Sequence, residues 1–309
     1  MLSAAVPNTT FGKRSTALDV TAGLDLTGKT VLLTGCTSGI GLETMRVLAL
    51  RGAHVLAAGR TEAKAAAAWA AVRTPEMKGR VTPLACEHED LASVVALADA
   101  VNAIKTPVDI LICNAGIVGS SKLQQINGVE KQFAVNHLSH FVLVNRLLDA
   151  VKAAPQGRVV IVSSEAHRTP GVTIEFDNLS GERKYGGLKF YGQSKLANLL
   201  MSNALARRLA GTNATSNALH PGVVRTAIFR NFPAVLRVPL DAVGKLFMKG
   251  PEAGAATTCY VATSPDLAKV SGLYFNDCKP DTPTATGQND AIAAKLWAVS
   301  EDMTRAYLR

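Results

Sequence analysis

The stretch Lys29-Thr-Val-Leu-Leu-Thr34, followed by Gly35-Cys-Thr-Ser-Gly-Ile-Gly41, decides the fold of this 309-residue chain. Its first half is rich in β-branched residues and leucine, which predicts a buried strand. The glycines at 35, 39 and 41 then predict a tight turn into a helix, which ends at Arg51-Gly52. Such a turn presents free backbone N–H groups at a helix N-terminus, an arrangement that binds a pyrophosphate. The spacing is GxxxGxG rather than GxGxxG, but the glycines serve the same physical purpose.

The alternation of an apolar strand and a helix continues along the chain. Strands are expected at 53–58, 81–85, 108–113, 158–163, 214–219 and 272–275, and helices at 63–72, 91–104, 129–151 and 191–209. This order predicts a single-domain α/β fold of the Rossmann type, a doubly wound parallel sheet of about seven strands with helices on both faces. Ligands of such sheets bind beyond the C-terminal ends of the strands. Residues 1–27 form an expected N-terminal extension, in which Thr16 and Asp19 are spaced as a capping box.

The composition excludes several classes of protein. Hydrophobic residues make up 48% of the chain and charged residues 18%, which excludes a disordered protein. No apolar run reaches the ~18 residues of a membrane span, and the N-terminus is too polar for a secretory signal. Five widely spaced cysteines indicate the reduced thiols of a cytoplasmic protein. The net charge is +9, but basic residues are not interleaved with aromatic ones, so we expect no nucleic-acid partner.

Arg60 stands at the end of the second expected strand, 19 residues past Gly41. In dinucleotide-binding folds, an Asp or Glu near this position binds the ribose 2′-hydroxyl of NAD. A guanidinium instead suits the 2′-phosphate of NADP. Arg60 therefore predicts NADP(H) over NAD(H). An NAD-preferring site and an arginine that merely faces solvent are the alternatives.

Tyr191 and Lys195 stand four residues apart at the start of an expected helix, so both side chains lie on one face. A tyrosine hydroxyl has a pKa near ~10, and a nearby ammonium lowers it toward the range of a general acid or base. Tyr185 and Lys189 have the same spacing. The two glycines between them disfavour a helix, so we prefer Tyr191 to Tyr185.

Four further signals accompany the glycine turn and the Tyr191–Lys195 pair. They are Asn-Ala-Gly at 114–116, Asn136, Ser164 and Pro-Gly at 221–222. Together and in this order, the signals resemble the short-chain dehydrogenase/reductase family. Finer stretches at 135–141, 162–167, 193–198, 220–224 and 295–297 are similar to its branch of retinol dehydrogenases and WW-domain oxidoreductases. The resemblance implies one NAD(P)-binding catalytic domain over residues 28–309.

The resemblance also implies an oxidoreductase that moves a hydride between the cofactor and an alcohol or carbonyl substrate. Tyr191 would exchange a proton with the substrate oxygen, and Lys195 would lower the pKa of Tyr191 and bind the nicotinamide ribose. Ser164 would polarise the substrate oxygen, and Asn136 would hold a water that links Lys195 to solvent. The other expected cofactor contacts are Gly35, Thr37, Ser38, Gly39, Ile40, Gly41, Arg60, Glu87, His88, Asn114, Ala115, Gly116, Pro221, Gly222, Val224 and Thr226.

Two stretches bear on the ligands more finely. Glu87-His88 departs from the Asp-Leu that the family often has there, although Glu87 keeps a carboxylate that can accept from the adenine amino group. The apolar residues 229–250 lie where the family places a segment that covers the substrate. They imply a lipophilic alcohol or carbonyl substrate. A packed core and a dimer surface are the other interpretations of this segment.

The remaining expectations concern metals and partners. His137 and His140 lie three residues apart, but no third ligand has helical spacing with them, so we expect no metal site. The resemblance implies a homodimer or homotetramer through the helices at 129–151 and 191–209. A cofactor-binding scaffold without turnover is the alternative to an enzyme. The intact set of four residues around Tyr191 argues against that alternative.

Overall fold

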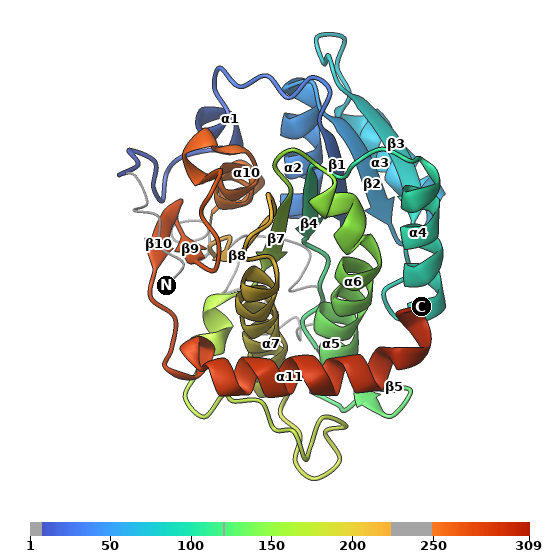
Figure 1. Cartoon of the computed structure of the whole chain (residues 1–309), viewed down its shortest axis with the longest axis vertical. Coiled ribbons are helices and arrows are strands. Elements are labelled where there is room, and N and C mark those ends of the chain that lie inside the picture. Colours follow the sequence, from blue (N-terminus) through green and yellow to red (C-terminus); the bar gives the residue numbers. More distant parts are fainter. Residues whose placement is uncertain (1–7, 120, 224–248) are drawn as a thin grey trace.

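A central sheet of eight strands organises the computed structural model, which describes residues 8–119, 121–223 and 249–309 (Figure 1). The strands are β1 Thr30–Thr34, β2 His54–Gly59, β3 Arg80–Ala85, β4 Ile110–Cys113, β7 Arg158–Val162, β8 Thr215–His220, β9 Tyr274–Asn276 and β10 Lys279–Asp281. Their order is β10-β9-β8-β7-β4-β1-β2-β3, and all neighbours are parallel except β9 and β10. The chain therefore winds in both directions from β1, and the predicted doubly wound fold is confirmed.

Helices cover both faces of this sheet. They are α1 Ala17–Val20, α2 Gly39–Leu50, α3 Glu62–Val72, α4 Leu91–Ala103, α5 Lys131–Phe133, α6 Ser139–Lys152, α7 Gly187–Arg208, α9 Pro251–Gly254, α10 Ala256–Thr263 and α11 Asp290–Thr304, with 3-10 turns η2 Glu165–Arg168, η4 Pro265–Leu267, η5 Thr286–Gln288 and η6 Arg305–Tyr307. On one face, α4, α6, α7 and α11 share a core with Leu32 and Leu56. On the other face, α1, α2, α3 and α10 share a core with Val31 and Val55. Because side chains alternate along a strand, one apolar run supplies both cores.

The helix expected at 129–151 is divided in the structure. Asn127 and Gly128 take left-handed backbone angles and close a hairpin between β5 (Gln125–Ile126) and β6 (Val129–Glu130). Asn-Gly is a strong local hairpin signal, and here it outweighs the helical pattern at 129–130. A π-helical turn, η1 (Ala134–Leu138), then separates α5 from α6. Turns of this kind often occur at functional sites, and this one carries Asn136.

Smaller differences concern element boundaries and strand number. α7 begins at Gly187, four residues before its expected start. β9 begins at Tyr274 rather than at 272, and the antiparallel β10 was not expected because Lys-Pro-Asp has no apolar pattern. Asp277 and Cys278 both have a positive φ and form the tight turn that joins β9 to β10. This turn carries β10 back along the edge of the sheet.

The described part of the expected N-terminal extension packs on the domain. Thr16 and Asp19 form the expected capping box, with the Thr16 N–H donating to Asp19 Oδ2 at 2.8 Å and the Asp19 N–H to Thr16 Oγ1 at 3.2 Å. Ala17 and Val20 are buried in the same core as Tyr260 of α10. The local pattern thus predicts the helix, whereas its docking depends on residues far along the chain.

α11 lies across α6 and α7 (Figure 1). The ring of Trp297 contacts that of Phe141 in α6 at 4.8 Å, and the Arg208 guanidinium of α7 lies 3.9 Å from the Trp297 ring centroid. α11 therefore occupies part of the helix surface through which the resemblance implies subunit contacts. A homodimer or homotetramer stays a prediction.

Some expectations fall outside the described residues. The segment expected to cover the substrate, 229–250, is described only at Lys249 and Gly250. Val224 and Thr226, expected to contact the cofactor, also lie outside. Within the described ranges, no helix is long and apolar enough to cross a membrane.

Candidate active site

A cavity of about 610 Å³ lies beyond the C-terminal ends of β1, β2, β4 and β7, where the parallel sheet predicts a ligand site. Of the predicted site residues, it is lined by Gly35, Thr37, Ser38, Gly39, Ile40, Gly41, Arg60, Glu87, His88, Asn114, Ala115, Gly116, Ser164, Tyr191, Lys195, Pro221 and Gly222. Asn136 does not line the cavity. Residues from seven separate stretches of the chain therefore meet around one space.

The glycine turn forms one wall of this cavity because its backbone is folded closely on itself. Gly35 has a φ of 72°, and a Cβ at Gly41 would overlap the carbonyl oxygen of Gly35. The Asn114 side chain fixes the turn from β4, donating to the carbonyl oxygens of Thr34 at 2.8 Å and Gly35 at 3.2 Å. The structure thus assigns Asn114 a direct part in holding the glycine turn.

Replacing Gly41 with Ala should disrupt this wall. The added methyl group meets backbone, which cannot rotate away, so we expect a loss of about 1–3 kcal/mol in stability. We also expect the melting temperature of the variant to rise less than that of wild type when NADPH is added. Thermal denaturation with and without NADPH measures both effects. Gly12→Ala is the control, because a Cβ there meets nothing within 4 Å. Wild-type melting behaviour of Gly41→Ala would contradict this account of the turn.

The residues present fit the dinucleotide that the glycine turn implies. The Ser38 side chain makes no hydrogen bond to the first turn of α2, so the N–H groups of that turn remain for an anionic ligand. His88 also lines the cavity, and its Nδ1 pairs with Ser139 Oγ at 2.8 Å. Its Nε2 is buried without a partner among the described residues. A polar ligand group at this wall would satisfy that nitrogen.

Arg60 and Glu87 face each other across the edge of the cavity. The Arg60 Nε lies 3.2 Å from Glu87 Oε2, and 62% of the Arg60 side chain is exposed. Lys64, in the first turn of α3, lines the same edge. Sequence reasoning missed Lys64, although its place four residues after Arg60, just past the N-cap Thr61, was a usable signal. The cavity lining here therefore carries the cations Arg60 and Lys64 beside the carboxylates of Glu87 and Glu89, of which Glu89 pairs with Lys131.

Ser164, Tyr191 and Lys195 come together at the other end of the cavity. Ser164 lies two residues past the end of β7 and caps the turn η2, whereas Tyr191 and Lys195 share one face of α7. The Lys195 Nζ lies 5.8 Å from the Tyr191 ring centroid and donates to the Val162 carbonyl oxygen at 3.2 Å. The cavity thus presents a hydroxyl, a phenol and an ammonium to the same space.

Burial dominates the electrostatics of this group. It lowers the pKa of Lys195 to about 8. It also raises the pKa of Tyr191 above its ordinary value, and a hydrogen bond with Ser164 opposes that rise only in part. The expected lowering of the Tyr191 pKa by Lys195 is therefore not the net effect in this structure. Desolvation of the phenolate is the largest cause of the shift, so Tyr191 is protonated at neutral pH.

Asn136 stands behind the cavity, in the π-helical turn. Its Oδ1 accepts from the Ile117 N–H at 2.8 Å, and its Nδ2 donates to the Ile117 carbonyl oxygen at 2.9 Å and to Ser194 Oγ at 2.9 Å. A Cβ at Gly116 would lie 3.2 Å from both Asn136 Oδ1 and Lys195 Nζ. Gly116 therefore leaves room beside both the Asn136 amide oxygen and the Lys195 ammonium.

The second Tyr–Lys pair is separated from this site. Tyr185 precedes α7, and its ring packs against that of Phe190 at 5.2 Å, whereas Lys189 lies within the helix and pairs with Glu175. Tyr185 does not line the cavity. The preference for Tyr191 agrees with this placement.

The histidines at 137 and 140 have hydrogen-bonding partners inside the core. His137 Nε2 pairs with Ser300 Oγ at 2.8 Å, and His140 Nε2 with Thr34 Oγ1 at 3.0 Å. Burial lowers their pKa values to about 3 and about 4, so both rings are neutral. Among the described residues, no group of three or more potential ligands could hold a metal ion.

Sequence reasoning included Ile40 and Pro221 but missed most of the other apolar side chains of the cavity. Leu188 is 62% exposed and Val223 is 54% exposed, and both line the cavity together with Ile117, Val118 and Val135. Leu188 precedes Tyr191 by three residues, so the two share one face of α7. An apolar residue at that spacing was the available signal.

Comparison with known proteins identifies the family. Residues 29–235 match the family model of short chain dehydrogenases. The chain belongs to this family. It is 42% identical over 304 residues to the short-chain dehydrogenase TIC 32 B, chloroplastic, of Brassica napus, a match that covers 94% of this chain and 93% of that protein. The predicted family is thereby confirmed, and with it a nicotinamide-dependent oxidoreductase in general terms.

Two other relatives confirm the branch. The chain is 38% identical over 305 residues to the WW domain-containing oxidoreductase of Gallus gallus, covering 96% of this chain and 73% of that protein. It is 39% identical over 292 residues to retinol dehydrogenase 14 of Homo sapiens, a match that covers 89% of this chain and 86% of that protein.

Solved structures share the fold. A protein of uncharacterised function from Mycobacterium paratuberculosis superimposes with a TM-score of 0.73 at 32% identity, covering 93% of this short-chain dehydrogenase and 97% of that chain. A candidate NAD(P) dependent gluconate 5-dehydrogenase from Beutenbergia cavernae, with bound NADP at low occupancy, has a TM-score of 0.65 at 26% identity and covers 82% and 96%.

Proposed function

We propose that this short-chain dehydrogenase transfers a hydride between NADP(H) and a lipophilic alcohol or carbonyl compound. The observation that carries the proposal is the meeting of Ser164, Tyr191 and Lys195 in one cavity with the glycine turn. A phenol and an ammonium beside a dinucleotide site suit the exchange of a proton at a carbonyl oxygen.

Each residue has a part in this proposal. The nicotinamide, when bound, supplies or accepts the hydride. Ser164 donates to the substrate oxygen and orients it, and Tyr191 gives that oxygen a proton during reduction or takes one during oxidation. Lys195 passes the proton on, and Asn136, which lies beside Gly116 as Lys195 does, supports the path to solvent. The raised pKa of Tyr191 favours its acting as the acid at neutral pH.

The preference for NADP(H) rests on the charged edge of the cavity. Arg60 and Lys64 both line the cavity, so both can approach a 2′-phosphate there. The ion pair with Glu87 holds the Arg60 guanidinium at the edge of the cavity. The NADP bound by the Beutenbergia cavernae structure is in keeping with this preference. An NAD-preferring dehydrogenase is the alternative, since Glu87 is also able to accept from a ribose hydroxyl or an adenine amino group.

The class of substrate follows from the apolar residues near Tyr191. Leu188 and Val223 expose apolar side chains into the cavity, and an apolar substrate would cover them. One relative is named for retinol, a lipophilic alcohol. We therefore propose a retinoid, a ketosteroid or an aromatic ketone as the kind of substrate.

A panel of carbonyl compounds tests the proposal. Purified protein is mixed with all-trans-retinal, a ketosteroid or acetophenone and with NADPH or NADH, and nicotinamide absorbance is followed. We expect oxidation of NADPH with at least one compound, at a higher kcat/KM than with NADH. Higher kcat/KM with NADH would favour the NAD-preferring alternative. Cofactor binding without turnover of any compound would favour a catalytically silent scaffold.

The rate of carbonyl reduction should fall as the pH rises through about 8. Burial lowers the pKa of Lys195 to about 8, so its ammonium loses the proton above that pH. Tyr191, with a raised pKa, stays protonated there, and the fall therefore belongs to Lys195. We expect kcat/KM for reduction to drop about tenfold per pH unit above 8, and alcohol oxidation to rise over the same range. A reduction rate that stays constant up to pH 10 would contradict this role of Lys195.

Location and assembly complete the proposal. All five cysteines are free and buried, which suits a reducing compartment, and we propose the cytoplasm. The Brassica napus relative is named chloroplastic, so an organelle is the alternative.

We also propose a homo-oligomer that uses those parts of α6 and α7 that α11 leaves free. The mass measured by light scattering decides between a monomer and an oligomer.

A further inference from the structure

We propose that a polar network between η2 and the hairpin β9–β10 positions Ser164, and that Tyr274 and Arg168 are positioning residues of the active site. The inference rests on the proposed function, since it assumes that Ser164 binds the substrate oxygen. It adds residues that lie 110 and four positions from Ser164 in the chain and do not line the cavity.

The backbone around Ser164 is held on several sides. The Ser164 carbonyl oxygen accepts from His167 Nδ1 at 2.6 Å, and its Oγ accepts from the Ala166 N–H at 3.2 Å. The next residue, Glu165, donates its N–H to His220 Nδ1 at 3.3 Å. Burial lowers the pKa of His220 to about 4, so that nitrogen is free to accept. The position of the Ser164 hydroxyl therefore depends on where η2 lies.

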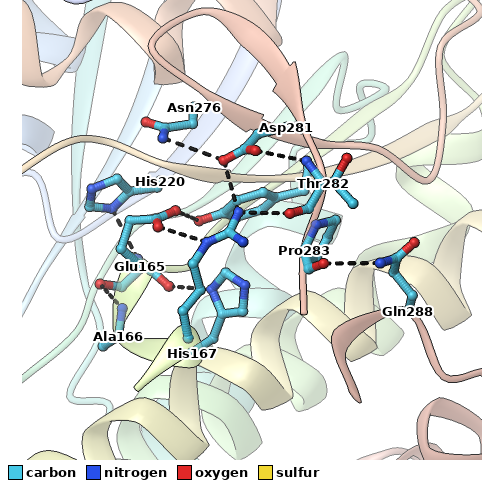
Figure 2. A network of polar contacts seen from close by, with 12 residues as sticks. Glu165, Ala166, His167, His220, Asn276, Asp281, Thr282, Pro283 and Gln288 are labelled. Carbon is cyan, nitrogen blue, oxygen red and sulfur yellow. Dashed lines mark hydrogen bonds and ion pairs between the residues drawn. The ribbon is translucent and has the colours of Figure 1, made fainter. Parts of the chain in front are cut away.

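The carboxylate of Glu165 ties η2 to the edge of the sheet (Figure 2). One oxygen accepts from the Tyr274 hydroxyl at 3.0 Å, and the other lies 2.7 Å from Arg168 Nε. Tyr274 is only 2% exposed, and both burial and the charge of Glu165 raise its pKa. Its hydroxyl therefore stays protonated and keeps donating to Glu165.

Arg168 extends the same network to β10. Its Nη2 donates to Asp281 Oδ2 at 2.9 Å and to the Thr282 carbonyl oxygen at 2.8 Å (Figure 2). Its guanidinium also lies 5.9 Å from the Tyr274 ring centroid, and the His167 ring meets that ring edge-on at 5.1 Å. Arg168 thus binds Glu165 within its own turn and Asp281 on the neighbouring hairpin.

Stability alone does not account for this arrangement. The side chains of Glu165, Arg168 and Asp281 are each about one third exposed, and exposed ion pairs contribute little to folding. The contacts of these three side chains, in contrast, restrain η2, the turn whose N-cap is Ser164. A small displacement of a group that orients the substrate costs up to about 100-fold in rate. Positioning is therefore the function that these contacts serve best.

A double-mutant cycle tests the proposal. Tyr274→Phe keeps the ring packed and removes only the hydroxyl. We expect it to lower kcat about 10-fold while the KM for NADPH stays unchanged. In a Ser164→Ala background the same change should alter kcat less than twofold, because there is no hydroxyl left to position. An equal loss in both backgrounds, or no loss in wild type, would overturn the proposal.

Two further variants keep the test decisive. Asp281→Asn weakens the contact with Arg168 at a partly exposed position, so it tests the network even if Tyr274→Phe does not fold. Asp302→Asn is the matched control, since Asp302 pairs with Arg305 at the exposed end of α11. We expect Asp281→Asn to lower kcat and Asp302→Asn to leave kcat at the wild-type value. Wild-type kcat for Asp281→Asn would overturn the proposal.

Amide hydrogen exchange of residues 163–168 supplies a readout without turnover. It should speed up in Tyr274→Phe and in Asp281→Asn but not in Asp302→Asn. Unchanged exchange in Tyr274→Phe and Asp281→Asn would show that the network does not restrain η2. If Ser164→Ala itself turns over like wild type, the proposed role of Ser164 is wrong. If Ser164→Ala loses activity while Tyr274→Phe does not, only the present inference is wrong.

Discussion

Replacing Tyr191 with Phe should lower the turnover of carbonyl compounds by about 10²- to 10⁴-fold, the range that general acid–base catalysis contributes. The change removes one hydroxyl from the wall of the cavity and leaves the ring, the glycine turn and Lys195 in place. The affinity for NADPH should therefore remain within about twofold of wild type, because the Tyr191 hydroxyl is proposed to act on the substrate oxygen and not to bind the cofactor. Steady-state rates and the fluorescence of bound NADPH measure the two effects separately.

Tyr185→Phe is the matched control for this prediction. Tyr185 also has a lysine four residues later, but it precedes α7 and packs against Phe190 outside the cavity. We expect its turnover to equal that of wild type. A large loss in Tyr185→Phe with full activity in Tyr191→Phe would show that the wrong tyrosine has been assigned.

The second large effect is expected at Arg60. Arg60→Asp removes the guanidinium proposed to meet the 2′-phosphate and places a carboxylate where NAD sites often have one. Each charged hydrogen bond is worth about 1.5–3 kcal/mol, so the ratio of kcat/KM with NADPH to that with NADH should fall about 10- to 150-fold. Initial rates with the two cofactors at limiting concentrations give this ratio.

Arg73→Asp makes the same change of charge at the C-cap of α3, on an exposed side chain outside the cavity. It should leave the cofactor ratio unchanged, which separates a specific contact from the overall loss of positive charge. If Arg60→Asp also leaves the ratio unchanged, Arg60 is a solvent-facing arginine and the preference for NADP(H) loses its basis.

Local patterns predicted the parts of this molecule that local physics determines. The apolar strands, the glycine turn and the capping box at Thr16 all depend on residues close together in the chain, and all occur within about two residues of their expected positions. The placement of Tyr191 and Lys195 in one cavity also followed from helical spacing. Local competition explains the main error in the fold, since Asn127-Gly128 forms a hairpin where a helix was expected.

Contacts between distant residues could not be predicted in the same way. Tyr274 meets Glu165 across 109 positions, and neither residue stands in a recognisable spacing with the other. The pKa of Tyr191 was expected to fall because the pattern shows Lys195 but not the burial of both groups. Desolvation depends on the packing of the whole fold. The direction of the Tyr191 pKa shift therefore follows only from the structure, and not from the local sequence.

Transfer of deuterium tests the central claim most directly. NADPH deuterated at the transferable position of its nicotinamide ring is mixed with the enzyme and the best carbonyl compound of the panel, and the alcohol product is analysed by mass spectrometry and NMR. We expect one deuterium on the carbinol carbon with wild type and only traces of product with Tyr191→Phe. A product that lacks deuterium at that carbon, or equal yields from both proteins, would contradict hydride transfer in a site where Tyr191 supplies the proton.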